Sequence, residues 1–226
     1  MTHEPIKKSF FNRDAVCVAK NLLGKIIYSK YKDLWLTAQI IETEAYYLND
    51  KASHASLGFT NKRKALLMSP GTIYMYFSRG ADSLNISCRG HGNAVLIKSG
   101  FPVKNSGEFD PMITIMQKLN PLKNKPGFRD IKNLCSGQTL LCKSLNLKVK
   151  DWDRKQFNFN RFFISDQNYS PKKIVTTRRL GISKGRDEHL PYRFIDHHFI
   201  DSCTKNPITK RTEEGLDYVI NSNQWD

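Results

Sequence analysis

The sequence lacks any long apolar run. No stretch of its 226 residues approaches the roughly 20 consecutive apolar residues that a membrane-spanning helix needs, and its polar first residues lead into no hydrophobic segment. We therefore expect a soluble protein that is neither secreted nor held in a membrane. The sequence also lacks a CxxC pair, since its cysteines are Cys17, Cys88, Cys135, Cys142 and Cys203. An odd number of scattered cysteines argues against a disulfide framework and a zinc site, and it favours a reducing compartment.

Acidic residues are scarce relative to basic ones. The chain has 36 Lys and Arg against 21 Asp and Glu, which gives a net charge of +15 and a pI near 9.6. The basic residues are spread along the whole chain, so a folded surface would carry them, as in proteins that bind phosphates. This balance indicates a polyanionic partner. A lysine-rich proteome would produce the same balance, so charge alone identifies neither partner nor reaction.

The order of the predicted elements indicates the fold class. Strands are predicted at 26–28, 34–46, 72–77, 83–88, 94–97, 159–164, 174–177 and 192–195, and helices at 15–23, 112–119 and 139–145. Strands that cluster early and late around central helices predict an α+β fold with a mainly antiparallel sheet and flanking helices. The hydrophobic content of 39% suits one domain, which we expect at 1–204. We expect a polar tail with at most one helical turn at 205–226.

Two glutamates stand out in the predicted strand at 34–46. Alternation places apolar residues from Leu34 to Ile40 on one face, and Glu42 and Glu44 continue that face. A core-facing carboxylate is costly to desolvate, so it needs donors or water, and near a reacting water it can act as a general base. The alternative is that the strand has already ended and both glutamates are solvated.

Candidate binding residues follow this strand. The polar loop after it carries His54 and then the basic cluster Lys62, Arg63 and Lys64. A loop held by a rigid strand is a common place for function, although His54 and the cluster could equally be ordinary surface residues. Arg79 falls at the tip of the hairpin predicted at 72–88. An exposed cation there suits contact with a nucleic-acid groove, or it only keeps the surface soluble.

Several segments match one known family in the family's order. They are Ile-Ile-Glu-Thr-Glu-Ala-Tyr at 40–46, Ala-Ser-His at 52–54, Met-Ser-Pro-Gly-Thr-Ile-Tyr-Met-Tyr at 68–76, Leu-Asn-Ile-Ser at 84–87, Val-Leu-Ile at 95–97, Leu-Cys-Ser-Gly at 134–137, Arg-Leu-Gly-Ile at 179–182 and Pro-Tyr-Arg-Phe at 191–194. Any one of them is a weak signal, but the ordered set is specific. Over roughly residues 9 to 200 the chain resembles the 3-methyladenine DNA glycosylases of the alkyladenine, or methylpurine, type.

The resemblance implies a fold, a reaction and a site. The expected fold is one domain with a curved antiparallel sheet, either a roll or a partly open barrel, and a protruding hairpin that enters the DNA minor groove. The expected reaction flips an alkylated purine out of the duplex and hydrolyses its bond to the sugar. By position, the resemblance implies that Glu44 is the general base that activates water. The expected pocket walls are Tyr46, His54 and Tyr76, and Leu180 is an apolar neighbour of the pocket. Asn85 is expected below the flipped nucleobase, where it would exclude the exocyclic amine of guanine.

The resemblance also implies partners and location. We expect double-stranded DNA with damaged purines as the partner, contacts from Arg79, Lys98 and the cluster Lys62, Arg63 and Lys64, no metal or other cofactor, and a monomer. The expected location is the cytoplasm, with the nucleoid, in a bacterium and the nucleus in a eukaryote.

Three residues depart from the family pattern. Arg79 replaces an intercalating tyrosine, and it is a poorer apolar wedge. Lys98 replaces an arginine near the sugar, which removes a bidentate phosphate contact and introduces an amine that could form a Schiff base. Asp82 adds a negative charge to a hairpin expected to approach DNA. These departures keep open an alternative, a nucleic-acid-binding module without catalysis, since the family fold is similar to the tRNA-binding C-terminal domain of methionyl-tRNA formyltransferase.

Overall fold

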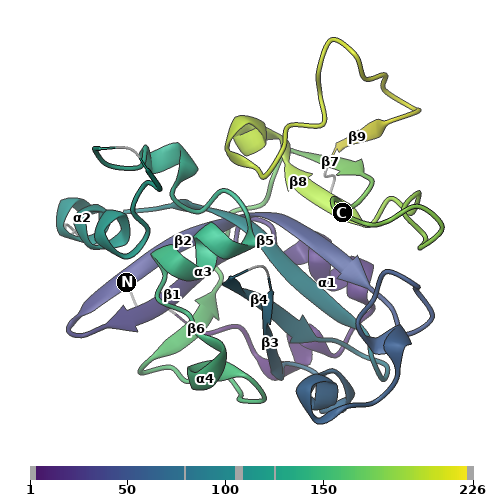
Figure 1. The fold of residues 1–226 in the computed structure, drawn as a ribbon, viewed down its shortest axis with the longest axis horizontal. Coiled ribbons are helices and arrows are strands. Elements are labelled where there is room, and N and C mark those ends of the chain that lie inside the picture. The colour runs from purple at the N-terminus through teal and green to yellow at the C-terminus, as the bar shows by residue number, and fades with distance from the viewer. Residues whose placement is uncertain (1–3, 79, 105–108, 125, 223–226) are drawn as a thin grey trace.

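One long strand organises the sheet. In the computed structural model, which describes residues 4–78, 80–104, 109–124 and 126–222, strand β2 (Leu34–Tyr46) is thirteen residues long. Strand β5 (Ala94–Pro102) pairs along one edge of β2. On the other edge, β1 (Ile26–Tyr31) pairs with the first half and β8 (Arg193–Asp196) with the second half. Strand β2 is therefore held on both edges where it carries Glu42 and Glu44 (Figure 1).

The described residues form one open sheet of nine strands. The order is β3 (Ile73–Ser78), β4 (Ala81–Ser87), β5, β2, β8, β7 (Lys173–Thr177) and β9 (Tyr218–Ser222), and β6 (Phe162–Ser165) joins through β1. Every pairing between these strands is antiparallel, and no pairing between described residues joins β9 back to β3. The α+β class and the mainly antiparallel sheet predicted from the sequence are confirmed, and the sheet is not closed into a barrel.

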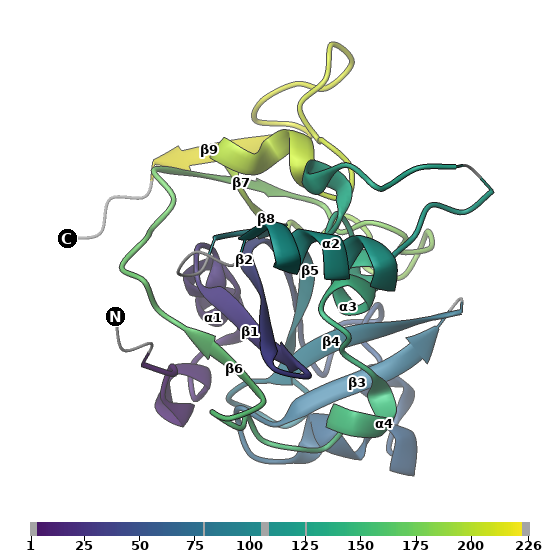
Figure 2. The same cartoon turned by 90° about the vertical axis from the view of Figure 1, so that its left-hand side faces the viewer.

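Helices cover the sheet. They are α1 (Ala15–Leu22), α2 (Phe109–Leu119), α3 (Gln138–Ser144) and α4 (Val149–Trp152), with 3-10 helices at Lys8–Phe11, Ala55–Leu57, Asn61–Leu67, Ile131–Asn133 and His197–Ser202. Asp14 caps α1 as the sequence predicts, because its Oδ1 accepts hydrogen bonds from the backbone N–H groups of Val16 at 2.9 Å and Cys17 at 3.2 Å. Helix α1 packs against β2, whereas α3 packs against β4 and β5 (Figures 1 and 2). None of the helices in the described ranges is long and apolar enough to cross a membrane.

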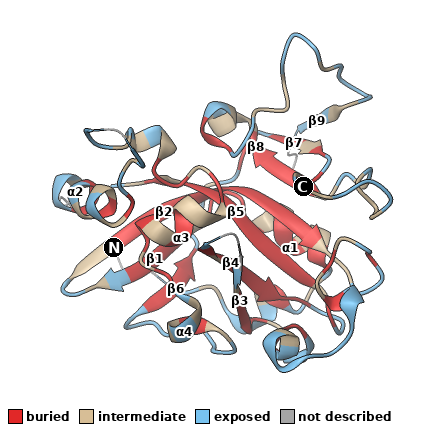
Figure 3. Ribbon diagram, in the orientation of Figure 1, coloured by how far each residue is buried: buried red, intermediate tan, exposed pale blue. Residues whose placement is uncertain are grey.

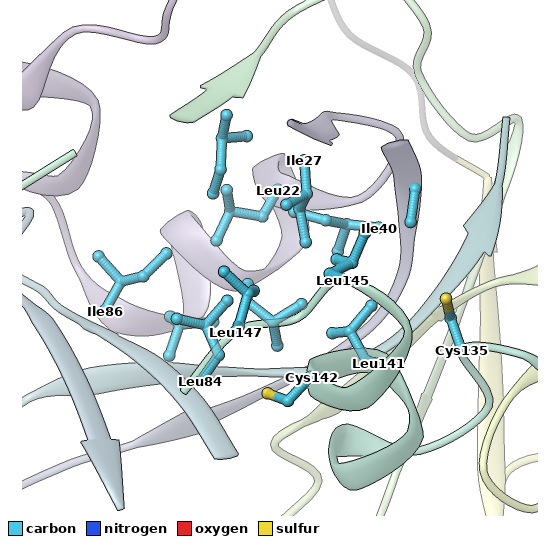
Figure 4. Close-up of a cluster of buried hydrophobic side chains, with 14 of the residues drawn as sticks. Leu22, Ile27, Ile40, Leu84, Ile86, Cys135, Leu141, Cys142, Leu145 and Leu147 are labelled. Carbon is cyan, nitrogen blue, oxygen red and sulfur yellow. The ribbon is translucent and has the colours of Figure 1, made fainter. Parts of the chain in front are cut away.

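The main core lies where these helices meet the sheet. Figure 4 shows side chains from α1, β1, β2, β4 and α3 in one cluster, among them Leu22, Ile27, Ile40, Leu84 and Leu141. Each is fully buried, and burying such a side chain stabilises the fold by about 1.5–3 kcal/mol. Burial also runs along most of β2 and β5 (Figure 3). The strand that carries Glu44 is therefore part of the rigid centre of the molecule.

A β-bulge changes the face on which the two glutamates lie. The pairing of β2 with β5 shifts register on both sides of Glu42, and an extra residue in a strand reverses the alternation that follows it. As a result Ala45, which regular alternation would place on the face opposite to Ile40, lies with Ile40 in the main apolar cluster. The prediction that both glutamates continue the apolar face is wrong for this reason. They are nevertheless inside the strand, and both are fully buried.

The segment predicted as a polar tail contributes to the sheet. Tyr218–Ser222 forms β9 and pairs with β7, so a strand takes the place of the expected helical turn. Tyr218 and Ile220 pack against a small buried cluster that contains Val175 and Ile195. The polar composition of the segment hid this short alternation of partly buried residues. Residues 223–226 lie outside the described range.

Candidate active site

Glu44 is held by three hydrogen-bond or ion-pair partners. Its Oε2 accepts a hydrogen bond of 2.6 Å from the hydroxyl of Tyr46, and its Oε1 lies 3.1 Å from Nζ of Lys98. The backbone N–H of Leu180 donates to Oε1 at 3.4 Å. The side chain of Glu44 is 0% exposed and that of Lys98 only 9%. A carboxylate buried to this degree requires such partners, because an unpaired charge in the interior is strongly unfavourable.

A cavity of about 780 Å³ opens next to this carboxylate. Its lining includes Tyr46, His54, Leu57, Tyr74, Tyr76, Asn85, Lys98, Gln138, Leu180 and Arg186. Its volume is in the range of pockets that enclose a small-molecule-sized group. Glu44 does not itself line the cavity, but Tyr46, Lys98 and Leu180, which hold it, all do. The carboxylate therefore lies one side chain behind the cavity wall.

Aromatic rings from two segments form part of that wall. His54, at the start of the 3-10 helix Ala55–Leu57, lies with its ring centroid 4.4 Å from that of Tyr76 on β3. Its Nδ1 is 2.9 Å from the hydroxyl of Tyr74, and the rings of Tyr74 and Tyr76 are 5.6 Å apart. Tyr46 lines the same cavity from the end of β2. The cavity thus offers several flat π-surfaces to a planar ligand.

Burial keeps these rings uncharged. Burial lowers the pKa of His54 below 6.5, and the positive charges of Arg63 and Arg186 lower it further, so the imidazole is neutral at pH 7. Burial also raises the pKa of Tyr46 well above 10, and the negative charge of Glu44 adds to this rise. The phenol of Tyr46 therefore keeps its proton and donates a hydrogen bond to the Glu44 carboxylate.

The two remaining predicted pocket residues also line the cavity. Asn85 on β4 is 6% exposed, and its Nδ2 donates to the backbone carbonyl of Tyr74 at 3.2 Å. This bond fixes the orientation of the amide. Leu180, half-buried in the segment after β7, presents its side chain to the cavity and its backbone N–H to Glu44. The structure thus brings together Tyr46, His54, Tyr76, Asn85, Leu180 and Lys98, with Glu44 directly behind them.

The predicted basic cluster divides into two kinds of residue. Lys62 and Lys64 are exposed on the 3-10 helix Asn61–Leu67. Arg63 is half-buried, and its Nη1 donates to the backbone carbonyls of Leu57 at 3.0 Å and Gly58 at 2.6 Å. Arg63 therefore closes the turn that carries Leu57 at the cavity.

Two residues of the hairpin formed by β3 and β4, Arg79 and Asp82, were expected to affect the approach to DNA. Arg79 lies outside the described residues. Asp82 accepts a hydrogen bond of 2.9 Å from the backbone N–H of Val149, the first residue of α4. The negative charge that was expected to oppose DNA is thus used at the start of a helix, where a carboxylate is favourable.

A second buried ion pair was not foreseen. Nε of Arg193 donates to Oε1 of Glu42 at 2.6 Å, and Oε2 of Glu42 accepts from the backbone N–H of Thr204 at 2.8 Å and from its hydroxyl at 2.9 Å. The hydroxyl of Ser99 also donates to Glu42, and it accepts from the backbone N–H of Gly137 at 2.9 Å. This network joins β2, β5, β8 and the start of α3, and it reaches the cavity at Gly137 and Thr204, which line it.

Arg179 and Asp50 form a third buried ion pair that sequence reasoning missed. Arg179 belongs to the Arg-Leu-Gly-Ile segment at 179–182, which gave a signal, but its partner is 129 positions away in the sequence. Gln138 was also missed. It lines the cavity at the start of α3, and its Nε2 donates to the hydroxyl of Ser83 at 3.0 Å.

No metal site is evident at the cavity. Among the residues that the structure describes, no three His, Cys, Asp or Glu side chains are grouped so that they could hold a metal ion. The polar groups at the cavity include the buried carboxylate behind its wall, the ammonium of Lys98, the guanidinium of Arg186, the imidazole of His54, phenols and amides.

Comparison with known proteins gives consistent similarities. The family model described as methylpurine-DNA glycosylase matches residues 9–199. A Pseudomonas aeruginosa protein provisionally named a 3-methyladenine DNA glycosylase is 52% identical over 97% of this chain and 92% of its own. A protein of the same name from Pseudomonas syringae pv. tomato is 51% identical over 95% and 96%, and one from Carboxydothermus hydrogenoformans is 31% identical over 84% and 93%.

Proposed function

Because the chain belongs to the methylpurine-DNA glycosylase family, we propose that it excises alkylated purines such as 3-methyladenine from duplex DNA with a water molecule that Glu44 activates. The protein is a DNA glycosylase of base excision repair, a hydrolase of N-glycosyl bonds. The observation that supports the assignment of Glu44 is its position, since it is the buried carboxylate whose three partners all line the aromatic cavity.

Base flipping explains why the site is a cavity. A purine inside a duplex has its glycosidic bond out of reach, so the nucleotide must leave the stack, and damaged bases do so at lower cost. Tyr46, His54 and Tyr76 supply the surfaces on which the flipped base stacks, at about 1–3 kcal/mol per base. A neutral His54 suits this role because it adds no positive charge against an alkylated purine that already carries one.

The proposed reaction needs one general base and a good leaving group. Glu44 takes a proton from water while the water oxygen bonds to C1′ of the sugar, and the glycosidic electron pair leaves with the alkylated purine, which thereby becomes neutral. The negative charge of Glu44 also stabilises the positive charge that develops on the sugar. The Tyr46 hydroxyl and the Leu180 N–H fix the direction of the carboxylate.

Lys98 supports the carboxylate in this scheme. Its Nζ is the ion-pair partner of Glu44 at 3.1 Å, and both groups are buried. We therefore assign Lys98 to orienting Glu44 and to contact with the nucleotide backbone, and not to covalent catalysis. Treating a reaction with borohydride tests this, since a Schiff base at Lys98 would leave the protein covalently attached to DNA.

Asn85 supports a preference among purines. Its amide is held by the Tyr74 carbonyl at the cavity, so it cannot turn away without losing that hydrogen bond. An amide fixed below the base would collide with the exocyclic amine of an undamaged guanine. Discrimination by such a clash is a general means of achieving specificity.

The duplex is expected to lie over the segment that surrounds the cavity mouth. Residues 51–81 contain no Asp or Glu and include five Lys or Arg. Within this segment Lys62 and Lys64 are exposed and available to phosphates, and the hairpin of β3 and β4 follows directly. A segment without acidic residues of its own favours approach of a polyanion.

Release of bases from methylated duplex DNA tests the proposal. We expect wild-type protein to release 3-methyladenine and Glu44→Gln to reduce the single-turnover rate by at least about 100-fold, the scale of general-base catalysis. The matched control is Glu213→Gln, which changes an exposed glutamate of the C-terminal segment. Undiminished release by Glu44→Gln would refute the role of Glu44. Duplex binding without any release by wild type would favour the non-catalytic binding module.

A further inference from the structure

The buried pair of Arg179 and Asp50 has no role in the chemistry described above. Arg179 lies in the segment after β7, and its side chain is 1% exposed, while that of Asp50 is 2% exposed. Both guanidinium Nη atoms contact the carboxylate, with Nη2 at 3.0 Å from Oδ1. Two charges removed from water in this way give little net stability compared with an apolar pair of similar volume. The pair therefore calls for an explanation other than stability.

The guanidinium contacts the backbone and the ring next to Glu44. Its Nη1 donates at 3.0 Å to the carbonyl of Ala45, the residue between Glu44 and Tyr46. Its Cζ lies 4.6 Å from the ring centroid of Tyr46. Tyr46 lines the cavity but Arg179 does not, so Arg179 covers the face of the ring that a flipped base would not use. This contact fixes the plane of one stacking wall.

Asp50 connects Arg179 to the turn before His54, which forms the other wall of the cavity. Its Oδ1 also accepts from the backbone N–H of Ala52 at 2.9 Å, and its carbonyl accepts from the N–H of Ser53 at 2.8 Å. These bonds shape the turn that delivers His54 to the cavity. The residue after Arg179 is Leu180, whose N–H donates to Glu44. One guanidinium thus links both walls to the segment that holds the catalytic carboxylate.

We propose that Arg179, through Asp50, is a positioning residue that sets the spacing of Tyr46 and His54 around the flipped base and aligns both with Glu44. This role rests on the proposed function. It requires the planar fork of arginine, because a lysine cannot contact two carboxylate oxygens and a carbonyl while lying flat on an aromatic ring. Its loss should therefore affect the geometry of excision more than the affinity for DNA.

Three variants separate positioning from stability. Arg179→Lys keeps the charge and removes the fork. The double variant Arg179→Met with Asp50→Leu removes both charges and leaves an apolar pair, so no buried charge is left without its partner. Arg178→Lys is the matched control, since Arg178 is the preceding residue, pairs with Asp217 at 2.8 Å and is 55% exposed. Each is assayed for single-turnover release of 3-methyladenine, for affinity toward undamaged duplex and for thermal stability.

We expect Arg179→Lys to lower the single-turnover rate by at least about tenfold, since small misplacements of reacting groups have effects of this size, while duplex affinity stays within about twofold of wild type. The double variant should have a thermal stability close to wild type and a rate as low as Arg179→Lys. Arg178→Lys should match wild type in both.

Two results would overturn the positioning role. One is a rate for Arg179→Lys that equals wild type. The other is a double variant that recovers its rate together with its stability, because the pair would then serve only the fold. Absence of base release by wild type would refute the proposed function itself, and the positioning role with it.

Discussion

The phenol of Tyr46 has two separable roles, which one substitution can divide. Tyr46→Phe keeps the ring that lines the cavity and removes the hydroxyl that donates at 2.6 Å to the fully buried Glu44. A hydrogen bond to a charged group contributes about 1.5–3 kcal/mol to stability. For a chain of this length, each kcal/mol corresponds to about 2–4 °C in melting temperature. We therefore expect the melting temperature of Tyr46→Phe to fall by about 3–12 °C.

The same change should slow base release. Without the hydroxyl, Glu44 keeps Lys98 and the Leu180 N–H as partners, both on Oε1, so the carboxylate is free to rotate. We expect the single-turnover rate to fall by about tenfold or more while duplex affinity is unchanged. Tyr46→Leu should lose a further 1–3 kcal/mol, or about 5- to 150-fold, in binding of the flipped base because the stacking ring is lost too.

The adjacent tyrosine provides a matched control for this prediction. The hydroxyl of Tyr47 also contacts a carboxylate, Asp14, at 2.8 Å and 3.0 Å, but on the surface at the start of α1. Tyr47→Phe should therefore leave the rate of base release unchanged. If Tyr46→Phe released bases as fast as wild type, Glu44 would not depend on its phenol donor, and the mechanism built on that contact would be refuted.

Three further predictions test the surroundings of the site. Burial lowers the pKa of His54, so the contribution of His54 to the free energy of unfolding is present above pH 6.5 and is lost as the pH falls. An NMR titration of the folded protein should give a pKa below 6.5 for His54, and a pKa above 6.5 would contradict a neutral ring. Asp82→Ala should lower stability by about 0.5–2 kcal/mol through loss of the oxygen that accepts from the N–H of Val149 at the start of α4, with no gain in duplex affinity. Tighter binding would show that the charge of Asp82 opposes DNA. Lys64→Met should weaken duplex binding and reduce, by about one, the slope of the logarithm of the binding constant against the logarithm of salt concentration. Arg63→Met should mainly lower the melting temperature, because Arg63 holds two backbone carbonyls. The reverse pattern would refute this division of roles.

Local patterns were sufficient to predict much of the fold. The cap at Asp14, the hairpin of β3 and β4 and the long strand to Tyr46 each follow from residues close together in the sequence. Such signals are local because capping, turns and alternation act over a few residues. The strand β9 was missed because its alternation is short and only partly buried.

Long-range pairs could not be predicted in this way. Arg179 and Asp50 are 129 positions apart, and Arg193 and Glu42 are 151 apart. A charged residue in the sequence gives no sign of whether it will be buried or which partner it will meet, since most charged residues are exposed. Only the path of the sheet brings these four side chains into the interior.

The two glutamates of β2 show what structure adds to a motif. Both are fully buried, and both have a basic partner, so burial and charge alone cannot decide between them. Glu42 accepts from Arg193, Ser99 and twice from Thr204, and replacing it would disconnect three strands and the start of α3. The partners of Glu44, which are Tyr46, Lys98 and Leu180, all line the cavity, whereas Thr204 is the one described partner of Glu42 that does. We therefore propose Glu44, and not Glu42, as the general base, because a general base must reach its water and most partners of Glu42 lie away from the cavity, in the network that holds the sheet together.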